Sequence, residues 1–217
     1  MNPALIELII LAGIAVFLFL RLRSVLGTRE GFEKPRMQPK NDAPKRDFKV
    51  IDGGEDKDIT DNVEKNSKSA KALKTIKEKD ETFTVNEFLS GARSAYEWIL
   101  MSFEKNEIDD IRELLSEEVA EAFDSVVEQR ISRGLTIEAE FIGVREMKLV
   151  DASYNSKTNT AEIAVSFIGE MTSVVKNSSG EIVEGDSKQI KRQKDTWTFS
   201  KDIQSSDPNW LLVATGE

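Results

Sequence analysis

The pattern of apolar and polar positions opens with a nearly unbroken apolar run over residues 3–20, in which Glu7 is the single charge. About 20 helical residues at about 1.5 Å each span a hydrocarbon core of about 30 Å. A cleaved secretory signal would carry Lys or Arg ahead of its apolar stretch, and no basic residue precedes this run. We therefore predict a membrane anchor over residues 1–23, built on Leu5, Ile9, Phe17, Phe19, Arg21 and Arg23.

A buried core helix is the alternative interpretation of this run, but the polar sequence that follows offers it no packing partner. The neighbouring charges predict an orientation. Residues 21–50 contain nine Lys or Arg and four Asp or Glu. Because cytoplasmic flanks of membrane helices carry the excess of Lys and Arg, we expect a single-pass topology with everything after the anchor in the cytoplasm.

Residues 24–80 have the composition of a charged, flexible linker. Phe32 and Phe48 are its only aromatic residues, and Pro and Gly interrupt it repeatedly. Near residues 63–79, lysines recur every third position and alternate with apolar residues such as Leu73 and Ile76, which indicates a helix. Two interpretations stay open for this segment: a solvated, partly helical linker, or a docking element for lipid or an acidic partner.

From residue 81 to residue 217 the pattern is that of a folded domain. Thr84 followed by Glu87 forms a capping box, and the apolar spacing after it predicts a long amphipathic helix over about 85–105. A short second helix follows near 108–115. Ser116 caps a third helix, which Gly134 ends.

After Leu135 the apolar period changes to two, which is typical of half-buried strands. Alternation over 135–141 and 161–171, a turn at 177–180, and two further strands near 196–200 and 210–214 predict an antiparallel sheet. Helices gathered ahead of such a sheet indicate an α+β fold class, with the helices packed on one sheet face.

Composition removes several function classes. The chain has no Cys and no His, which excludes disulfides, thiolate nucleophiles, Cys/His zinc sites and imidazole chemistry. Residues 81–217 hold fourteen basic and twenty-six acidic residues, a net charge of −12, so we expect no nucleic-acid partner. No phosphate-binding glycine motif or nucleophile elbow is present, and we expect no cofactor and no metal.

Three strings carry a family resemblance: TVNEFLSGARSAYEWILMSFEKN, LLSEEVAEAF and DTWTFSKDIQSSDPNWLLVAT. Over about residues 83–215 the chain resembles the bacterial branch of the Tim44-like domain family, often called TimA. The apolar run of residues 3–20 and the basic segment after it, the tether, resemble that branch as well. The resemblance implies a bacterial inner-membrane location and a cystatin-like or nuclear-transport-factor-two-like cone, in which a curved antiparallel sheet wraps the helices and an apolar pocket lies at the open end.

The resemblance also implies a non-enzymatic role. The mitochondrial relative tethers a DnaK-type chaperone to the presequence translocase, and its C-terminal domain is implicated in contact with cardiolipin-rich membrane. We therefore expect an adaptor whose partners are membrane lipid and a protein such as a DnaK-type chaperone or a membrane complex. The alternatives are a lipid or amphipathic-ligand carrier and, less favoured, an enzyme with a buried acid–base pair facing the cavity.

Side chains alternate between the two faces of a strand, and this alternation predicts which residues line the pocket. Asp195 shares parity with Trp197 and Phe199, and Arg145 shares parity with Phe141, so each places a charge toward the cone unless it reaches water at a strand end. Tyr96 lies on the apolar side of the first long helix and is assigned to the core in preference to catalysis. The pocket or ligand-binding candidates are Phe88, Tyr96, Phe141, Arg145, Asp195, Trp197, Phe199 and Trp210.

Overall fold

The computed structural model describes residues 56–216. The predicted membrane anchor (residues 1–23, with Leu5, Ile9, Phe17, Phe19, Arg21 and Arg23) and residues 24–55 of the predicted linker lie outside the described residues. Within residues 56–216, no helix combines the length and the apolar composition that crossing a bilayer requires.

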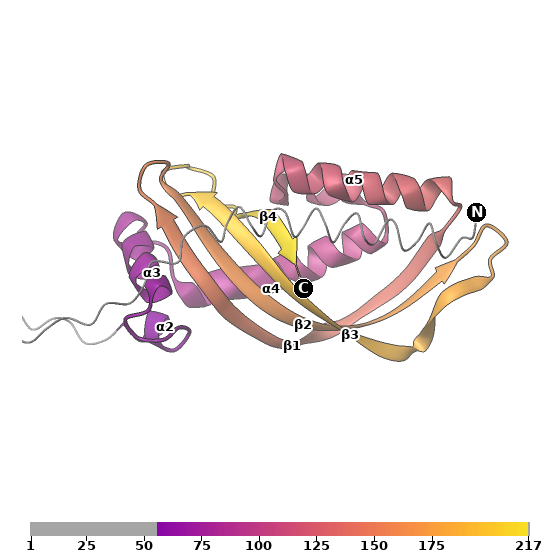
Figure 1. Ribbon diagram of the computed structural model, residues 1–217, viewed down its shortest axis with the longest axis horizontal. Coiled ribbons are helices and arrows are strands. Elements are labelled where there is room, and N and C mark those ends of the chain that lie inside the picture. Colours follow the sequence, from indigo (N-terminus) through magenta and orange to yellow (C-terminus); the bar gives the residue numbers. More distant parts are fainter. Residues whose placement is uncertain (1–55, 217) are drawn as a thin grey trace, which may run out of the picture. The chain divides into compact units, whose positions relative to one another are not determined.

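Helices come first and strands follow (Figure 1). The helices are α2 (Lys57–Thr60), α3 (Lys68–Lys79), α4 (Val85–Glu104), the 3-10 helix η1 (Ile108–Leu114) and α5 (Glu117–Ser132). The strands are β1 (Thr136–Asn155), β2 (Thr160–Lys176), β3 (Ile182–Asp202) and β4 (Leu211–Gly216). All neighbouring strands are antiparallel, in the order β1-β2-β3-β4, which confirms the predicted α+β class.

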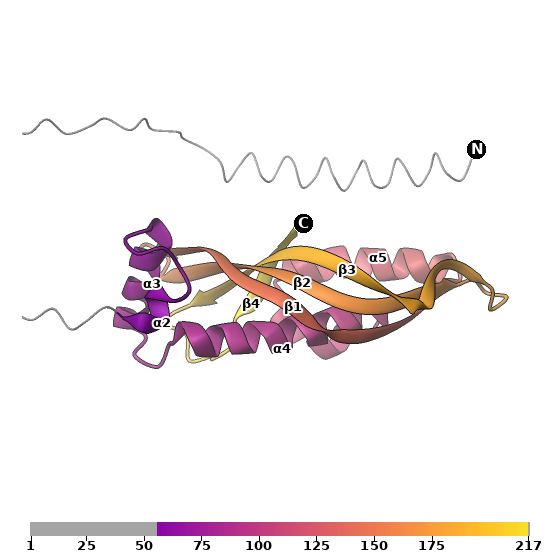
Figure 2. The same cartoon turned by 90° about the horizontal axis from the view of Figure 1, so that it is seen from below.

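The sheet is long and strongly curved, and α4 runs along its concave side (Figures 1 and 2). On β2 every second residue from Ala161 to Met171 is buried, so one face of this central strand is apolar throughout. β1 bends through three register shifts, at Ile142, Arg145 and Val150. Such bulges add a residue to one strand and increase its local bend, which matches the curvature of the sheet.

α4 begins and packs as the capping box predicts. The Thr84 hydroxyl accepts a hydrogen bond from the Glu87 amide at 3.1 Å, and the Glu87 carboxylate accepts one from that hydroxyl at 3.0 Å. The buried face of the helix contacts the concave face of the sheet: Val85, Phe88, Leu89, Ala92, Tyr96, Ile99 and Leu100. Because this face meets the apolar face of β2 and β3, α4 contributes more buried apolar residues to the core than any other helix.

α5 is held to the end of α4 by Arg130 and by the rings of Phe103 and Phe123, whose centroids are 4.5 Å apart. The Arg130 guanidinium lies 4.2 Å from the centroid of the Phe103 ring and donates a 2.9 Å hydrogen bond to the Phe103 carbonyl. Its second partner is Glu104, 3.7 Å away. Burial is the largest influence on the Glu104 carboxyl and leaves its pKa above the ordinary value of 4.5, although Arg130 opposes the shift.

The folded core begins earlier than the residue 81 that composition suggested. Residues 56–80, which we assigned to the linker, form α2 and α3, and the lysine-rich helix spans Lys68–Lys79. Leu73 and Ile76 are fully buried, and Ile59 belongs to the same hydrophobic core. Leu73 and Ile76, with Ser69 bonded to β1 and Lys77 paired with Asp56 and Asp58, hold α3 to the domain, while Lys68, Lys71 and Lys74 are exposed.

α2 is fixed to α4 by one carboxylate. Asp58 accepts hydrogen bonds from the backbone amides of Val85 at 2.7 Å and Asn86 at 3.0 Å, and its Oδ2 lies 3.0 Å from Nζ of Lys77. These amides have no partner within their own helix, and the positive end of the helix dipole favours a carboxylate there. Asp58 therefore joins three helices at a single point.

We predict that Asp58→Asn lowers the free energy of unfolding by about 1–2 kcal/mol at pH 7, because the charged cap of α4 is lost. Burial alone would raise the pKa of Asp58, but the amides of Val85 and Asn86 and the Lys77 ammonium outweigh it and hold the pKa below its ordinary value of 3.8. The contribution is therefore present above pH 3.8 and is lost as the pH falls through the folded-state pKa.

Urea denaturation of the full chain at pH 7 and at low pH measures this effect. Asp56→Asn is the matched control, because Asp56 also pairs with Lys77 but is 46% exposed, and Asn caps a helix as well as Asp. An equal loss in both variants, or a loss for Asp58→Asn that does not shrink at low pH, would contradict the assignment.

Candidate functional site

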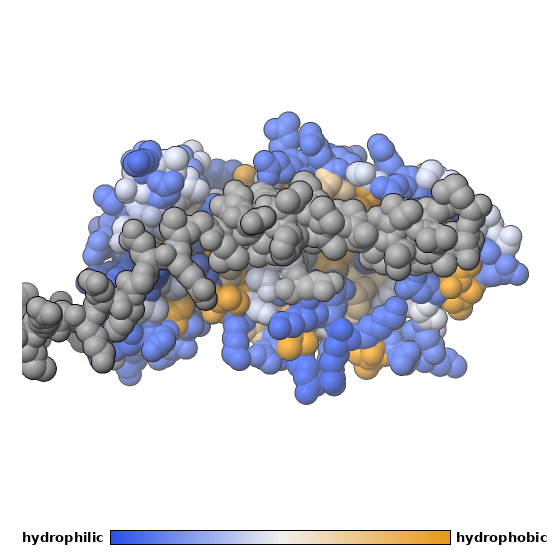
Figure 3. All heavy atoms as spheres, viewed as in Figure 1, coloured by the Kyte–Doolittle hydropathy of each residue, from blue (hydrophilic) through white to orange (hydrophobic). Residues whose placement is uncertain are grey.

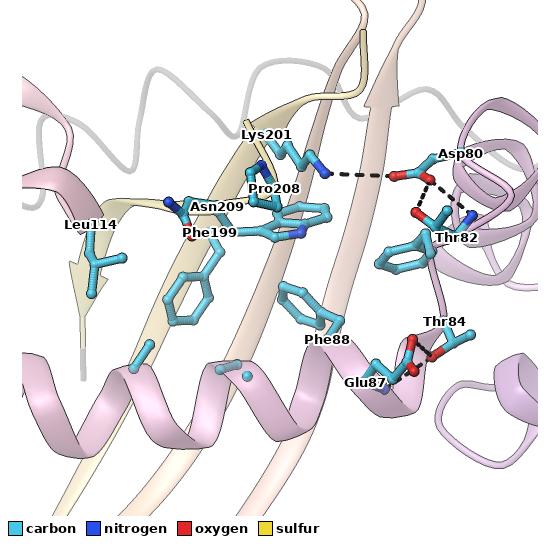
Figure 4. Close-up of a pocket in the computed structure, with 15 residues that line it drawn as sticks. Asp80, Thr82, Thr84, Glu87, Phe88, Leu114, Phe199, Lys201, Pro208 and Asn209 are labelled. Carbon is cyan, nitrogen blue, oxygen red and sulfur yellow. Dashed lines mark hydrogen bonds and ion pairs between the residues drawn. The ribbon is translucent and has the colours of Figure 1, made fainter. Parts of the chain in front are cut away.

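A pocket of about 360 Å³ opens at the end of the domain where α3 joins α4 (Figure 4). Its walls come from the α3–α4 connection, the first half of α4, the end of β3 and the loop before β4, with Leu114 of η1 closing one side. Segments more than a hundred residues apart in the sequence therefore meet here.

Aromatic rings form the apolar wall. Trp210 lies 5.9 Å from the ring of Phe83 and 4.8 Å from that of Phe88, and Phe88 is 6.0 Å from Phe199, all between ring centroids. The contacts of Phe88 with Trp210 and Phe199 are edge-on, the arrangement that aromatic pairs favour. Trp210 is only partly buried, so one side of its indole is available to a bound group.

The rim of the pocket is polar. Oδ1 of Asp80 accepts hydrogen bonds from the hydroxyl and the amide of Thr82, and its Oδ2 lies 3.6 Å from Nζ of Lys201 (Figure 4). The Thr82 hydroxyl is the largest influence on the Asp80 carboxyl and, with the Thr82 amide and Lys201, holds its pKa below 3.8 against the effect of burial. The Lys201 side chain is only 12% exposed, so its charge is confined to the pocket mouth.

The floor of the pocket is made of small residues on α4. Gly91, Ala92 and Ala95 line it, and a Cβ placed on Gly91 would meet no atom within 4 Å. The space over Gly91 is therefore free for a ligand group, and a larger residue at this position would occupy the pocket without displacing the core.

A second aromatic cluster lies farther along α4, within the core. Tyr96 is fully buried, stacks on Phe167 with 4.4 Å between centroids, and contacts Trp197 at 4.7 Å and Phe141 at 6.1 Å. Its hydroxyl donates a 2.5 Å hydrogen bond to Oδ2 of Asp195. Burial and, after it, the Asp195 carboxylate raise the pKa of Tyr96 well above its ordinary value of 10.0, so the phenol stays protonated as the donor.

The sheet makes room for this ring through one glycine. A Cβ on Gly169 of β2 would lie 2.6 Å from the Tyr96 hydroxyl oxygen and 3.1 Å from the nearest ring carbon. Asp195 receives a second hydrogen bond, which the side-chain amide of Gln193 donates to its Oδ1 at 3.0 Å. Its two carboxylate oxygens thus each have a donor, as a buried carboxylate needs.

The family model of the Tim44-like domain matches residues 69–217. The chain belongs to the Tim44-like domain family. The match begins inside α3, which agrees with the packing of that helix on the domain. This confirms the family that the sequence resembled.

Other comparisons add little. The crystal structure of the intermembrane space region of the chloroplast protein ARC6 is 8% identical, with a TM-score of 0.36 over 66% of this chain and 94% of that chain, too distant to bear on fold or function. No curated protein matches the chain.

In the structure of the Tim44-like domain, the residues predicted to line the pocket fall into three groups by position. Phe88, Phe199 and Trp210 line the pocket. Tyr96, Phe141, Asp195 and Trp197 form the buried cluster instead, outside the pocket lining. Arg145 is exposed and pairs with Glu170 at 3.4 Å on the sheet surface.

Arg145 is therefore not a pocket residue: of its two expected alternatives, the cone or water, the structure shows the second. Register shifts on either side of Val144 insert Ile142 and Arg145 as unpaired residues, which breaks the alternation that linked Arg145 to Phe141. The expectation for Asp195 is met, because β2 and β3 keep a continuous register from Thr160 to Met171.

Sequence reasoning missed several pocket residues, among them Asp80, Phe83, Gly91 and Lys201. Lys201 shares the parity of Asp195, Trp197 and Phe199, so the argument that found those residues also reaches Lys201. Gly91 and the residues of the α3–α4 connection carry no signal of their own. Within residues 56–216, no group of three or more acidic side chains could hold a metal ion.

We predict that Tyr96→Phe lowers the free energy of unfolding by about 1–3 kcal/mol, because Oδ2 of the buried Asp195 loses its donor. Urea denaturation followed by tryptophan fluorescence measures the loss. Tyr154→Phe is the control, since the Tyr154 hydroxyl donates to Asn159 at 3.0 Å in a partly buried site. An equal or larger loss for the control would mean that the hydrogen bond to Asp195 contributes no more to stability than a partly buried one.

We also predict that Gly169→Ala is destabilising and that Tyr96→Phe relieves part of this cost. The added methyl collides first with the Tyr96 hydroxyl, which the Phe variant removes, while the ring contact remains. A double-mutant cycle with the two single variants and the double variant measures the coupling, which we expect at about 1 kcal/mol. Strictly additive effects would place the cost of Gly169→Ala elsewhere.

Proposed function

We propose that this protein is a membrane-anchored, non-enzymatic adaptor that binds a protein partner through the pocket of its Tim44-like domain. The anchor is the apolar run of residues 1–23, and the domain lies on the cytoplasmic side of a bacterial inner membrane. The partner is a component of protein transport or membrane protein quality control, such as a DnaK-type chaperone or a membrane complex.

One observation carries the proposal: the pocket opens at the end of the domain where the chain arrives from its N-terminal part. The α3–α4 connection lines the pocket, and Asp58 holds α2 to the first amides of α4 beside it. A protein bound in the pocket would therefore be held close to α2, the first described element of the chain. This is the arrangement that an adaptor needs if it is to keep a partner close to a membrane.

The pocket has the chemistry of a protein-binding hot spot. Phe83, Phe88, Phe199 and Trp210 form an apolar wall, and Gly91 leaves open space in front of it. At about 360 Å³ the space accepts one or two apolar side chains of a partner. Buried anchors of this kind supply most of the affinity at protein interfaces, while the polar rim fixes orientation.

Catalysis is the less favoured interpretation. An enzyme on this fold would need an acid–base pair facing its cavity. The buried Tyr96–Asp195 pair is outside the pocket lining, and in the pocket the carboxylate of Asp80 is already bound by Thr82 and Lys201.

A lipid-binding role is the second candidate, and two observations favour it. Lys201 places a largely buried ammonium at the mouth of an aromatic pocket, which suits an anionic headgroup above an acyl chain. On α3, Lys68, Lys71, Lys74 and Lys79 are exposed opposite the buried Leu73 and Ile76. Each lysine near an anionic membrane surface contributes about 1 kcal/mol to binding.

The variant Gly91→Leu tests the role of the pocket without destabilising the fold. We predict that it raises the free energy of unfolding by up to about 1 kcal/mol, because Leu favours helix over Gly, while its side chain fills the pocket. With a photo-crosslinking amino acid at the pocket residue Asn209, the full chain is irradiated in native membranes. Mass spectrometry then identifies crosslinked protein and lipid in wild type and variant.

The adaptor proposal expects a protein crosslink that Gly91→Leu removes and that the matched control Ser90→Leu, on an exposed position outside the pocket, retains. The captured protein, once purified, should bind Gly91→Leu at least tenfold more weakly than wild type. Lipid alone, lost in the same variant, supports the second candidate. A protein crosslink that is indifferent to Gly91→Leu contradicts binding through the pocket.

A further inference from the structure

The two edges of the sheet differ. At the β1 edge, helices reach the backbone: the Arg93 guanidinium donates to the Val144 carbonyl at 2.6 Å, and the Ser69 hydroxyl accepts from the Ala152 amide at 3.2 Å. At the other edge, β4 pairs with β3 only from Thr196 to Ser200. Within the described residues, the stretch 182–195 of β3 is therefore an open sheet edge. We call it the β3 edge.

The β3 edge lies at the end of the sheet opposite α2 and α3, where β2 and β3 form a hairpin (Figures 1 and 2). Its large apolar residues Ile182, Val183 and Ile190 are each more than half exposed. Figure 3 shows apolar surface at this end of a face that is otherwise mostly hydrophilic. Exposed β-branched residues along an unpaired strand are what strand addition by a second polypeptide uses.

The same edge carries the densest positive charge of the domain. Lys188, Lys191, Arg192 and Lys194 fall within seven residues, and with Glu184, Asp186 and Asp195 they give residues 182–195 a net charge of +1, against −12 for residues 81–217. Arg192 donates to the Glu170 carboxylate at 2.9 Å. In the part of the chain that the structure describes, Lys188, Lys191 and Lys194 have no ion pair within 4.0 Å. Lys191 and Lys194 interact at longer range with Glu104 and Glu146, but among the described residues none of the three ammonium groups is held in a close ion pair.

Charge selects the occupant. A second copy of this chain joined through the same edge would bring two basic runs to strand spacing, about 5 Å apart and inside the screening length of about 8 Å. Lysines at an open edge disfavour such self-pairing. A segment rich in Glu or Asp instead meets opposite charges along the same ladder, where facing pairs are favourable.

We propose that the β3 edge binds an extended, acidic segment of a partner protein by strand addition. The segment carries Glu or Asp at alternate positions. Over residues 191–195, Arg192 and Lys194 are on one face of β3 and Lys191 is on the other, so the carboxylates of the added strand lie beside Arg192 and Lys194. This deepens the proposed adaptor function and rests on it, because it assigns a second contact at the end of the domain opposite α2 and α3.

The shape of β3 limits the length of the added strand. Residues 187–190 have no partner on β2, and Gly185, at φ 84°, precedes this bulge in a position where a Cβ would collide with the Ser173 carbonyl. The regular part of the edge is Lys191–Asp195. A ladder of five residues is short, so charge supplies much of the affinity and binding weakens as salt increases.

The test uses the full chain, purified in a zwitterionic detergent, and a fluorescent twelve-residue peptide that alternates Glu and Val. We expect saturable binding by fluorescence anisotropy, a loss of at least fivefold between low and physiological salt, and slower amide hydrogen exchange over residues 191–195. Lys188→Glu/Lys194→Glu should weaken binding at least tenfold. Lys105→Glu/Lys157→Glu, with the same charge change at exposed positions elsewhere, should change it less than twofold.

A peptide with N-methylated amides at alternate positions keeps the charges but cannot form a ladder, and it should not bind. Equal binding of this peptide would overturn strand addition. Self-association of the chain through residues 191–195, or tighter binding of a single-stranded oligonucleotide than of the peptide at this edge, would overturn the choice of occupant. Gly91→Leu should leave peptide binding unchanged, so failure of the pocket proposal and failure of this one are distinguishable.

Discussion

The insertion of Tyr96 between α4 and the concave face of the sheet is the constraint on which the rest of the domain depends. The ring needs a glycine opposite it, a flat aromatic partner beneath it and a carboxylate at its tip, and Gly169, Phe167 and Asp195 supply these from two neighbouring strands. Because each requirement is met at one register only, the contact fixes both the depth of α4 and its position along the strands. The pocket, one and a half turns earlier on the same helix, inherits its geometry from this contact.

The two ends of the domain have different chemistry because they are built differently. At the α3–α4 end, helices, a loop and strand ends converge, so backbone groups are capped and aromatic residues enclose a pocket. At the hairpin end, the sheet extends past β4, and the first half of β3 is exposed on both faces. The first end suits apolar side chains, and the second suits an extended backbone with negative charge. An adaptor with two such ends can hold one protein at two points, or two proteins at once.

Local sequence signals predicted most of this fold, and their failures share a cause. Thr84 with Glu87, and Ser116, located the starts of α4 and α5, and alternation along β2 located the buried sheet face. The first half of β3 was missed because it is exposed on both faces and so has no alternation. The bulge at Arg145 was missed because a register shift depends on the partner strand. Only the pocket residues on helices and strands could be predicted from the sequence, because the α3–α4 connection has no periodic pattern of apolar residues.

The carboxylate of Asp58 has a mechanical consequence. It lies in α2, the first described element of the chain, and is bonded to the first amides of α4. Tension applied through the N-terminal part of the chain would therefore load these two hydrogen bonds before it reaches the aromatic core. Their rupture would free α2 while Leu73 and Ile76 still hold α3 in place. The domain would unfold in steps under load: the hydrogen bonds to Asp58 would break first, and the hydrophobic core would open only later.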